Sequence, residues 1–161
     1  MTSNDSLDRF AQLLVDAVRV VGDRPLDAQL ERHLNDQLPP TGSLFQSIFQ
    51  SCRDAIAAGW MCNRSAGGIR YGRVIKPAQQ LGRFSVDVVE MNDVIGPSHA
   101  HPNGEIDMVM PLSEGAKFDG RGAGWLVYPA GSRHAPTVTS GSALVLYLLP
   151  EGAIDFGAAE I

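Results

Sequence analysis

Two short histidine-bearing segments constrain this chain most strongly, because their side chains can meet only if the chain between them folds back. The first, residues 96–107, contains His99, His101 and Glu105, and the second, residues 129–134, ends in another histidine. His99 and His101 are separated by one residue, so both imidazoles project from the same face of an extended strand. Imidazole nitrogens and a carboxylate oxygen that converge from two strand ends are suitable ligands for a divalent transition metal.

The ligands and their spacing resemble the two signature motifs of the cupin superfamily, which are small β-barrels with a metal in the mouth. The match consists of His-x-His-x-x-x-Glu at residues 99–105 and Pro-x-Gly-x-x-His at residues 129–134. The chain has Asp93 and Leu112 where the cupin pattern has glycines, and Val138 where it has an asparagine. These departures affect turns and one polar contact. The resemblance therefore implies a cupin-like (RmlC-like jelly-roll) β-barrel with all four metal ligands in place.

The four expected ligands are His99, His101, Glu105 and His134. A single buried histidine is usually a hydrogen-bonded core residue, and His33, which lies among helical residues without a partner in view, is interpreted in that way. Three of the chain's 4 histidines, in contrast, fall within the two motifs. Iron, manganese, nickel, copper and zinc all accept such ligands, and the affinity order alone does not choose among them.

Residues 6–59 carry apolar side chains at spacings of three and four, which predicts three amphipathic helices. Ser6 is expected to cap the first helix and Gly22 to end it. Pro25 is expected in the first turn of the second helix, and Ser43 is expected to begin the third. These helices are expected to pack on the barrel or to form an oligomer interface, such as that of a homodimer.

After residue 68 the sequence changes to short apolar runs separated by Gly, Pro, Asn and Asp, which is typical of an all-β barrel or sandwich. The predicted strands are residues 69–75, 84–90, 98–101, 105–110, 125–128 and 143–149. The 161 residues are enough for one domain with a sizeable core. We therefore expect a mainly β protein, with a helical N-terminal segment at residues 1–62 and the barrel at residues 63–161.

Composition and charge exclude several classes of protein. The net charge of −5 argues against nucleic-acid binding, which requires a basic stripe with interleaved aromatic residues. No apolar run reaches the length of a membrane span, and the amino end lacks the layout of a signal peptide. A cytoplasmic location is therefore expected, with Cys52 and Cys62 as free thiols.

Asp107 and Glu105 are the catalytic candidates. Asp107 follows Glu105 by two residues and therefore faces the same way on a strand. A partly desolvated carboxylate beside a cation can act as a general acid or base, or it can orient a ligand histidine. Both roles for Asp107 remain open at the level of sequence, whereas Met108 and Met110 are expected on the opposite face.

Substrate-binding candidates come from three parts of the chain. The planar fork of arginine matches a carboxylate in two parallel hydrogen bonds, so Arg64, Arg70 or Arg73 can anchor an acidic substrate. Lys117 lies in an expected loop before Trp125 that can serve as a lid, and Tyr128 can line the cavity. Solvated arginines and packed tyrosines are common, so a purely structural role is the alternative for each.

Most of the chain also resembles the 4-hydroxylaminobenzoate lyase family of nitroaromatic degradation. The similarity lies in residues 62–64, 69–73, 101–108, 116–120, 122–125 and 143–150. The resemblance implies a carbon–nitrogen lyase that converts 4-hydroxylaminobenzoate to 3,4-dihydroxybenzoate with release of ammonia. It also implies a small aromatic carboxylic acid as the binding partner.

Two other functions remain open from the sequence. The same metal ligands serve iron-dependent cupin dioxygenases, and such an enzyme acting on a small aromatic acid would consume oxygen during turnover. A non-catalytic cupin that binds a small molecule would show saturable ligand binding and no product.

Overall fold

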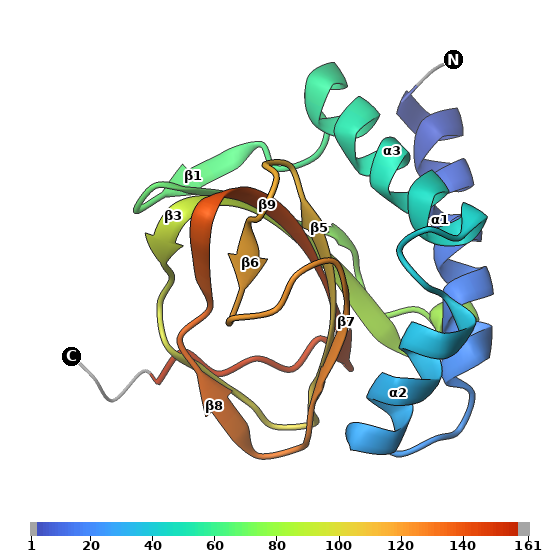
Figure 1. Cartoon of the computed structure of the whole chain (residues 1–161). Coiled ribbons are helices and arrows are strands. Elements are labelled where there is room, and N and C mark those ends of the chain that lie inside the picture. Colours follow the sequence, from blue (N-terminus) through green and yellow to red (C-terminus); the bar gives the residue numbers. More distant parts are fainter. Residues whose placement is uncertain (1–2, 158–161) are drawn as a thin grey trace.

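The computed structural model of the protein describes residues 3–157, in which three helices are followed by antiparallel β-structure (Figure 1). The helices are α1 (Ser3–Val21), α2 (Ala28–Gln37) and α3 (Ser43–Ala58), with a short 3-10 helix η1 (Gln79–Leu81). The strands are β1 (Arg64–Ala66), β2 (Ile69–Ile75), β3 (Phe84–Ile95), β4 (His99–His101), β5 (Glu105–Pro111), β6 (Lys117–Phe118), β7 (Gly124–Tyr128), β8 (Ser132–His134) and β9 (Thr137–Pro150).

The helix boundaries agree with the sequence at Gly22 and Ser43 and differ elsewhere. Gly22 ends α1 in the left-handed conformation, at φ +57°, and α3 begins at Ser43. The expected cap at Ser6 is wrong, because α1 already begins three residues earlier. Pro25 lies outside α2, because the side chain of Asp27 caps this helix and accepts a hydrogen bond from the amide of Leu30 at 2.9 Å.

The strands form two sheets. The larger sheet has the order β1-β2-β3-β9-β5-β7, with β6 paired to β9, and the smaller one consists of β4 and β8. All six predicted strands are present, whereas β1, β6 and β8, which contain two or three residues each, were not predicted. The loop expected at Lys117 is wrong, since Lys117 pairs with Thr139 and Phe118 with Val138. Within residues 3–157, the hydrogen-bonded strand order does not close on itself.

The two faces of the larger sheet bury separate hydrophobic clusters. Side chains alternate between faces along a strand, so Met108 and Met110 of β5 lie on the opposite face from Glu105 and Asp107, as predicted, and they pack with the helices. Glu105, Asp107 and Val109 point the other way, toward the inner face that the β4–β8 sheet covers. The three helices lie on one side of the sheet (Figure 1), and the polar residues of the two motifs lie on the opposite side.

Helix α2 covers the free edge of β7, one end of the larger sheet. The amide side chain of Asn35 accepts a hydrogen bond from the backbone N–H of Trp125 and donates one to its carbonyl, both at 2.9 Å. The carboxylate of Glu31 accepts a hydrogen bond from the backbone N–H of Val127 at 3.0 Å. Unpaired edge strands invite association with other chains, so these contacts protect the sheet.

Replacing Asn35 with alanine is expected to lower the free energy of unfolding by about 2 kcal/mol, because two backbone groups of Trp125 lose their partners. Urea denaturation measures the change. Gln37→Ala, which removes an exposed amide from the same helix, is the matched control and is expected to stay within about 0.5 kcal/mol of wild type. Equal stability of the two variants would show that α2 does not hold this edge through Asn35.

Two further expectations concern the described part of the chain. None of its helices is both long and apolar enough to cross a membrane. Cys52 and Cys62 are buried free thiols, as predicted. Burial raises the pKa of the Cys62 thiol to about 12, so this residue stays protonated and unreactive at neutral pH.

Candidate metal and active site

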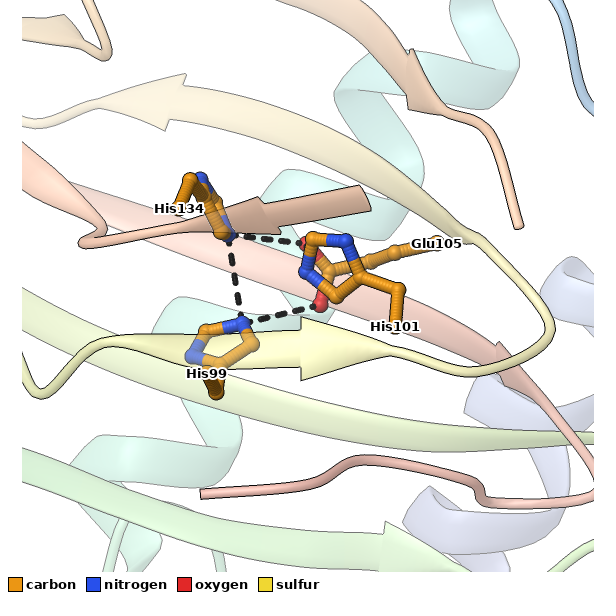
Figure 2. A group of neighbouring side chains, drawn as sticks. All are labelled: His99, His101, Glu105 and His134. Carbon is orange, nitrogen blue, oxygen red and sulfur yellow. Dashed lines mark hydrogen bonds and ion pairs between the residues drawn. The ribbon is translucent and has the colours of Figure 1, made fainter. Parts of the chain in front are cut away.

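Three histidines and one glutamate converge on the inner side of the sheet from three different strands (Figure 2). His99 and His101 come from β4, Glu105 begins β5, and His134 ends β8. The register of the smaller sheet places His99 directly opposite His134. Segments that are far apart in sequence are therefore brought together as the two motifs predicted.

A tight turn carries the chain from the last histidine of β4 to the glutamate of β5. Gly104 occupies this turn at φ +89°, and a Cβ atom there would lie 2.8 Å from the carbonyl oxygen of Tyr128. Both the positive φ and the close approach require glycine. The turn thus allows Glu105 to lie four residues after His101 and still face its imidazole.

The spacing of the four side chains fits a single metal ion. The Nε2 atoms of His99, His101 and His134 lie 3.6, 3.3 and 3.5 Å from the nearest carboxylate oxygen of Glu105. The Nε2 atoms of His99 and His134 are 3.2 Å apart. Two ligand atoms at a tetrahedral angle, each about 2.1 Å from a metal, are about 3.4 Å apart.

The same atoms lack other partners. Both carboxylate oxygens of Glu105 and the Nε2 atom of His101 are fully buried, and none of them has a hydrogen-bond partner among the residues the structure describes. A buried polar atom without a partner costs about 1–3 kcal/mol. A bound cation would satisfy all three atoms at once, so the chemistry of the donor set fits a divalent metal.

The opposite ring nitrogens of the two β4 histidines face hydrogen-bond acceptors. The Nδ1 atom of His99 lies 3.3 Å from the carbonyl oxygen of Pro97. The hydroxyl of Ser132 donates its proton to the carbonyl of Pro129 at 2.6 Å, so it accepts a hydrogen bond from Nδ1 of His101 at 2.9 Å. Both Nδ1 atoms therefore carry hydrogen, which leaves the Nε2 lone pairs directed at the metal position.

His134 has a charged partner that sequence reasoning missed. Its Nδ1 atom lies 2.6 Å from the carboxylate of Asp119, which also accepts hydrogen bonds from the Tyr128 hydroxyl and, at 2.9 Å, from the backbone N–H of Thr137. The Asp-Gly pair that begins at Asp119 indicates a turn. Nothing in its spacing predicts a contact with His134, because the two residues meet only through the pairing of β6 with β9.

The electrostatics of the cluster follow from burial and from these contacts. Burial alone would raise the pKa of Glu105, but contacts with His101, His134 and His99 outweigh it and hold that pKa well below its usual range. Burial lowers the pKa of His134, whereas the hydrogen bond to Asp119 and the neighbouring carboxylate of Glu105 raise it to about 9. The cluster thus contains an ionised carboxylate and an imidazole that binds cations strongly, whether protons or metal.

Asp107 lies beside Glu105 on the inner face and is fully buried. Burial raises its pKa well above the usual range, and the neighbouring charge of Glu105 raises it further. Neither carboxylate oxygen has a hydrogen-bond partner in the described part of the chain. The Nδ1 atoms of the three histidines contact other groups, so Asp107 does not orient a histidine through Nδ1.

The arginine candidates lie away from this cluster. Arg70 pairs with Glu90 at 3.2 Å, on the face of the sheet that packs against the helices. Arg73 forms a two-pronged ion pair with Asp87, with N–O distances of 2.8 and 3.2 Å. Arg64 lies on β1, at the opposite end of the strand order from β5 and β7.

Arg73 shares the inner face with Asp107 but is three strands away. The register runs from Arg73 through Asp87 and Tyr147 to Asp107, a span of about 14 Å between backbones. Lys117 is exposed on β6 and alternates with Phe118, which points inward. The structure therefore does not bring these cationic side chains next to the imidazoles.

Tyr128 is the substrate-binding candidate that does lie in the cluster. Its ring centroid is 4.4 Å from that of His134 and 5.3 Å from that of His101. Its hydroxyl is bonded to Asp119, as described above.

Comparison with known proteins places this site in a family. The model of the family described as PnbB, 4-hydroxylaminobenzoate lyase, matches residues 12–156. A 4-hydroxylaminobenzoate lyase of Pseudomonas putida is 32% identical over 166 residues, which cover 92% of this chain and 94% of that protein. One from Nocardioides sp. (strain LMS-CY) is 34% identical over 142 residues, which cover 83% and 84% of the two chains.

Solved structures agree on the fold. A crystal structure from a study of DMSP lyases aligns with 99% of this chain and 96% of its own, at a TM-score of 0.50 and 15% sequence identity. The likeness therefore extends over the helices as well as the β-structure. By sequence over nearly its whole length, the chain belongs to the PnbB 4-hydroxylaminobenzoate lyase family.

Proposed function

We propose that this protein is a carbon–nitrogen lyase that converts 4-hydroxylaminobenzoate, or a closely related hydroxylamino aromatic acid, to 3,4-dihydroxybenzoate and ammonia. Family membership over residues 12–156 supports the reaction class. The observation that carries the proposal in the structure is the convergence of three Nε2 atoms and one carboxylate in a buried site. A buried site of this kind allows a nitrogen–oxygen bond to be broken away from bulk water.

The reaction balances without an external oxidant. One molecule of water is consumed overall, the nitrogen–oxygen bond breaks, and nitrogen leaves as ammonia. The electrons that reduce the nitrogen come from the ring, which gains two carbon–oxygen bonds and loses one carbon–nitrogen and one carbon–hydrogen bond. The protein must therefore supply proton transfer and activation of an oxygen atom, but no redox partner.

His99, His101, Glu105 and His134 would hold a divalent metal, and iron, manganese, zinc, nickel and copper all suit three imidazoles and one carboxylate. A metal bound there supplies a Lewis acid that can polarise the oxygen of the hydroxylamino group. The protein contributes the fixed orientation of the imidazoles and the exclusion of water, because His101 and Glu105 have no exposed side-chain surface.

Asp107 is the residue we propose for proton transfer. Its burial and the adjacent charge of Glu105 favour the protonated carboxyl, which can donate a proton to a leaving hydroxyl group. Afterwards the carboxylate can take a proton from the water that attacks the ring. Asp107 thus acts first as an acid and then as a base, and it is restored at the end of the cycle.

Substrate recognition rests on the walls of the site. The ring of Tyr128 packs on two of the imidazoles and offers an aromatic surface for the substrate ring. Arg73 is the arginine candidate on the inner face, and its guanidinium is already bound to Asp87 and to the carbonyl of Gly152. A substrate carboxylate would have to compete with Asp87 for it.

The test is anaerobic turnover of 4-hydroxylaminobenzoate by protein loaded with each candidate metal in turn. We expect ammonia and 3,4-dihydroxybenzoate in equal amounts with at least one metal. Turnover that requires and consumes oxygen would favour a dioxygenase instead. Saturable binding of the aromatic acid without any product would favour a binding protein. A homo-oligomeric assembly remains a prediction, which sedimentation of the same sample checks.

A further inference from the structure

Asp119 occupies a strained turn immediately after β6, where its carboxylate is held by three donors. It has a left-handed backbone, at φ 49°, and it binds the Nδ1 atom of His134, the Tyr128 hydroxyl and the backbone N–H of Thr137. The carboxylate side chain is 17% exposed, so these contacts are largely shielded from water.

We propose that Asp119 and Tyr128 form a positioning pair that holds His134 for metal binding. The inference rests on the metal site of the proposed function. It assigns roles to two residues outside the ligand set, and it gives the hydroxyl of Tyr128 a supporting role for a ligand.

His134 is the histidine that most requires such support. Its side chain is 11% exposed, whereas those of His99 and His101 are 2% and 0% exposed. Its greater exposure allows water to compete with a fixed orientation of the ring. The negatively charged partner of His134 offsets this exposure, because charge-assisted hydrogen bonds are stronger than neutral ones.

The contacts of Asp119 define which ring nitrogen of His134 carries hydrogen. The carboxylate oxygens of Asp119 accept hydrogen bonds from the Tyr128 hydroxyl and from the backbone N–H of Thr137, and their third contact is the Nδ1 atom of His134. The Nδ1 atom of His134 must therefore donate, which leaves Nε2 to face the metal position. Loss of the carboxylate would allow the ring to flip or to take the other tautomer.

Tyr128 completes the pair from the side of the cluster. Its ring packs on His134, and its hydroxyl donates to the same carboxylate, so rotation of Asp119 would cost both contacts. Because the hydroxyl proton is already donated to Asp119, it is not free to bind a substrate carboxylate. Removal of a hydroxyl that binds substrate would raise KM, whereas removal of a hydroxyl that positions His134 would lower metal affinity.

The test measures metal affinity by competition with a chelator, together with kcat and KM. Asp119→Asn is expected to weaken metal binding roughly 10- to 100-fold, because partners that orient metal ligands commonly contribute that much. Tyr128→Phe removes one hydrogen bond to the carboxylate and is expected to weaken metal binding by about fivefold, with KM unchanged. A raised KM with unchanged metal affinity in Tyr128→Phe would return Tyr128 to substrate binding and overturn the pair.

Asp93→Asn is the matched control. Asp93 also has a left-handed backbone, at φ 42°, and its carboxylate accepts a hydrogen bond from the backbone N–H of Gly141 at 3.1 Å. This variant should bind metal as wild type does. Metal affinity of Asp119→Asn equal to that of Asp93→Asn would overturn the proposal. Wild-type protein that takes up no metal would instead overturn the proposed metal site together with this inference.

Discussion

Replacing Glu105 with glutamine is expected to weaken metal binding by at least about 100-fold and to stop ammonia release, since loss of even an outer partner of a metal ligand costs 10- to 100-fold. Glu105 contributes a negative charge that touches all three imidazoles, and it has no exposed surface. Glutamine has nearly the same shape but no charge, so the fold should persist. Metal content and ammonia release of the purified variant measure the two effects.

Glu90→Gln is the control for this substitution. Glu90 lies on β3, pairs with Arg70 and faces the helices, so its replacement leaves the inner face unchanged. We expect normal metal content and normal turnover in this variant. A Glu105→Gln protein that keeps both bound metal and full activity would refute the role of Glu105 as a ligand.

Replacing Asp107 with asparagine is expected to lower kcat by about 100- to 10,000-fold, the usual contribution of a positioned acid or base. Metal content should not change, because no histidine Nδ1 atom contacts Asp107. Asparagine keeps the shape of the side chain but cannot transfer a proton at neutral pH. Steady-state kinetics and elemental analysis of the same preparation separate the two quantities.

Asp87→Asn is the matched control for Asp107→Asn, because Asp87 is another carboxylate on the inner face. Tyr147 lies between the two residues in the cross-strand register. Asp87 is bound to Arg73 and lies about 10 Å from Asp107 between backbones, so kcat should change little. Full turnover of Asp107→Asn would exclude proton transfer by this residue. Loss of metal from Asp107→Asn would show instead that Asp107 helps to hold the ligands.

Much of this site was predictable because the positions of its side chains depend on residues close to them in the sequence. The alternation of His99 and His101 fixes a shared face on any extended strand, and Gly104 indicates the turn that returns Glu105 to them. The inward direction of Asp107 follows from the same alternation. The apolar periodicity of residues 6–59 likewise predicts helices, since one face of each must be buried.

The remaining features depend on contacts between distant segments. The bond from His134 to Asp119 exists only because β6 pairs with β9, and a two-residue strand leaves no periodic signal in the sequence. The ion pairs of Arg70 and Arg73 depend on cross-strand register, which the sequence of either strand alone does not specify. Helix α2 begins after Asp27 and not at Pro25, because the Asp27 carboxylate accepts a hydrogen bond from an otherwise unpaired backbone amide of the first turn. Proline has no side-chain acceptor for such an amide.

Elemental analysis of the purified wild-type protein, with ammonia release measured before and after treatment with a chelator, tests the central claim most directly. The structure predicts about one divalent transition metal per chain, loss of ammonia release when it is removed, and recovery when it is restored. Full ammonia release from protein that contains no metal would contradict the assignment of the three histidines and Glu105 as a catalytic metal site.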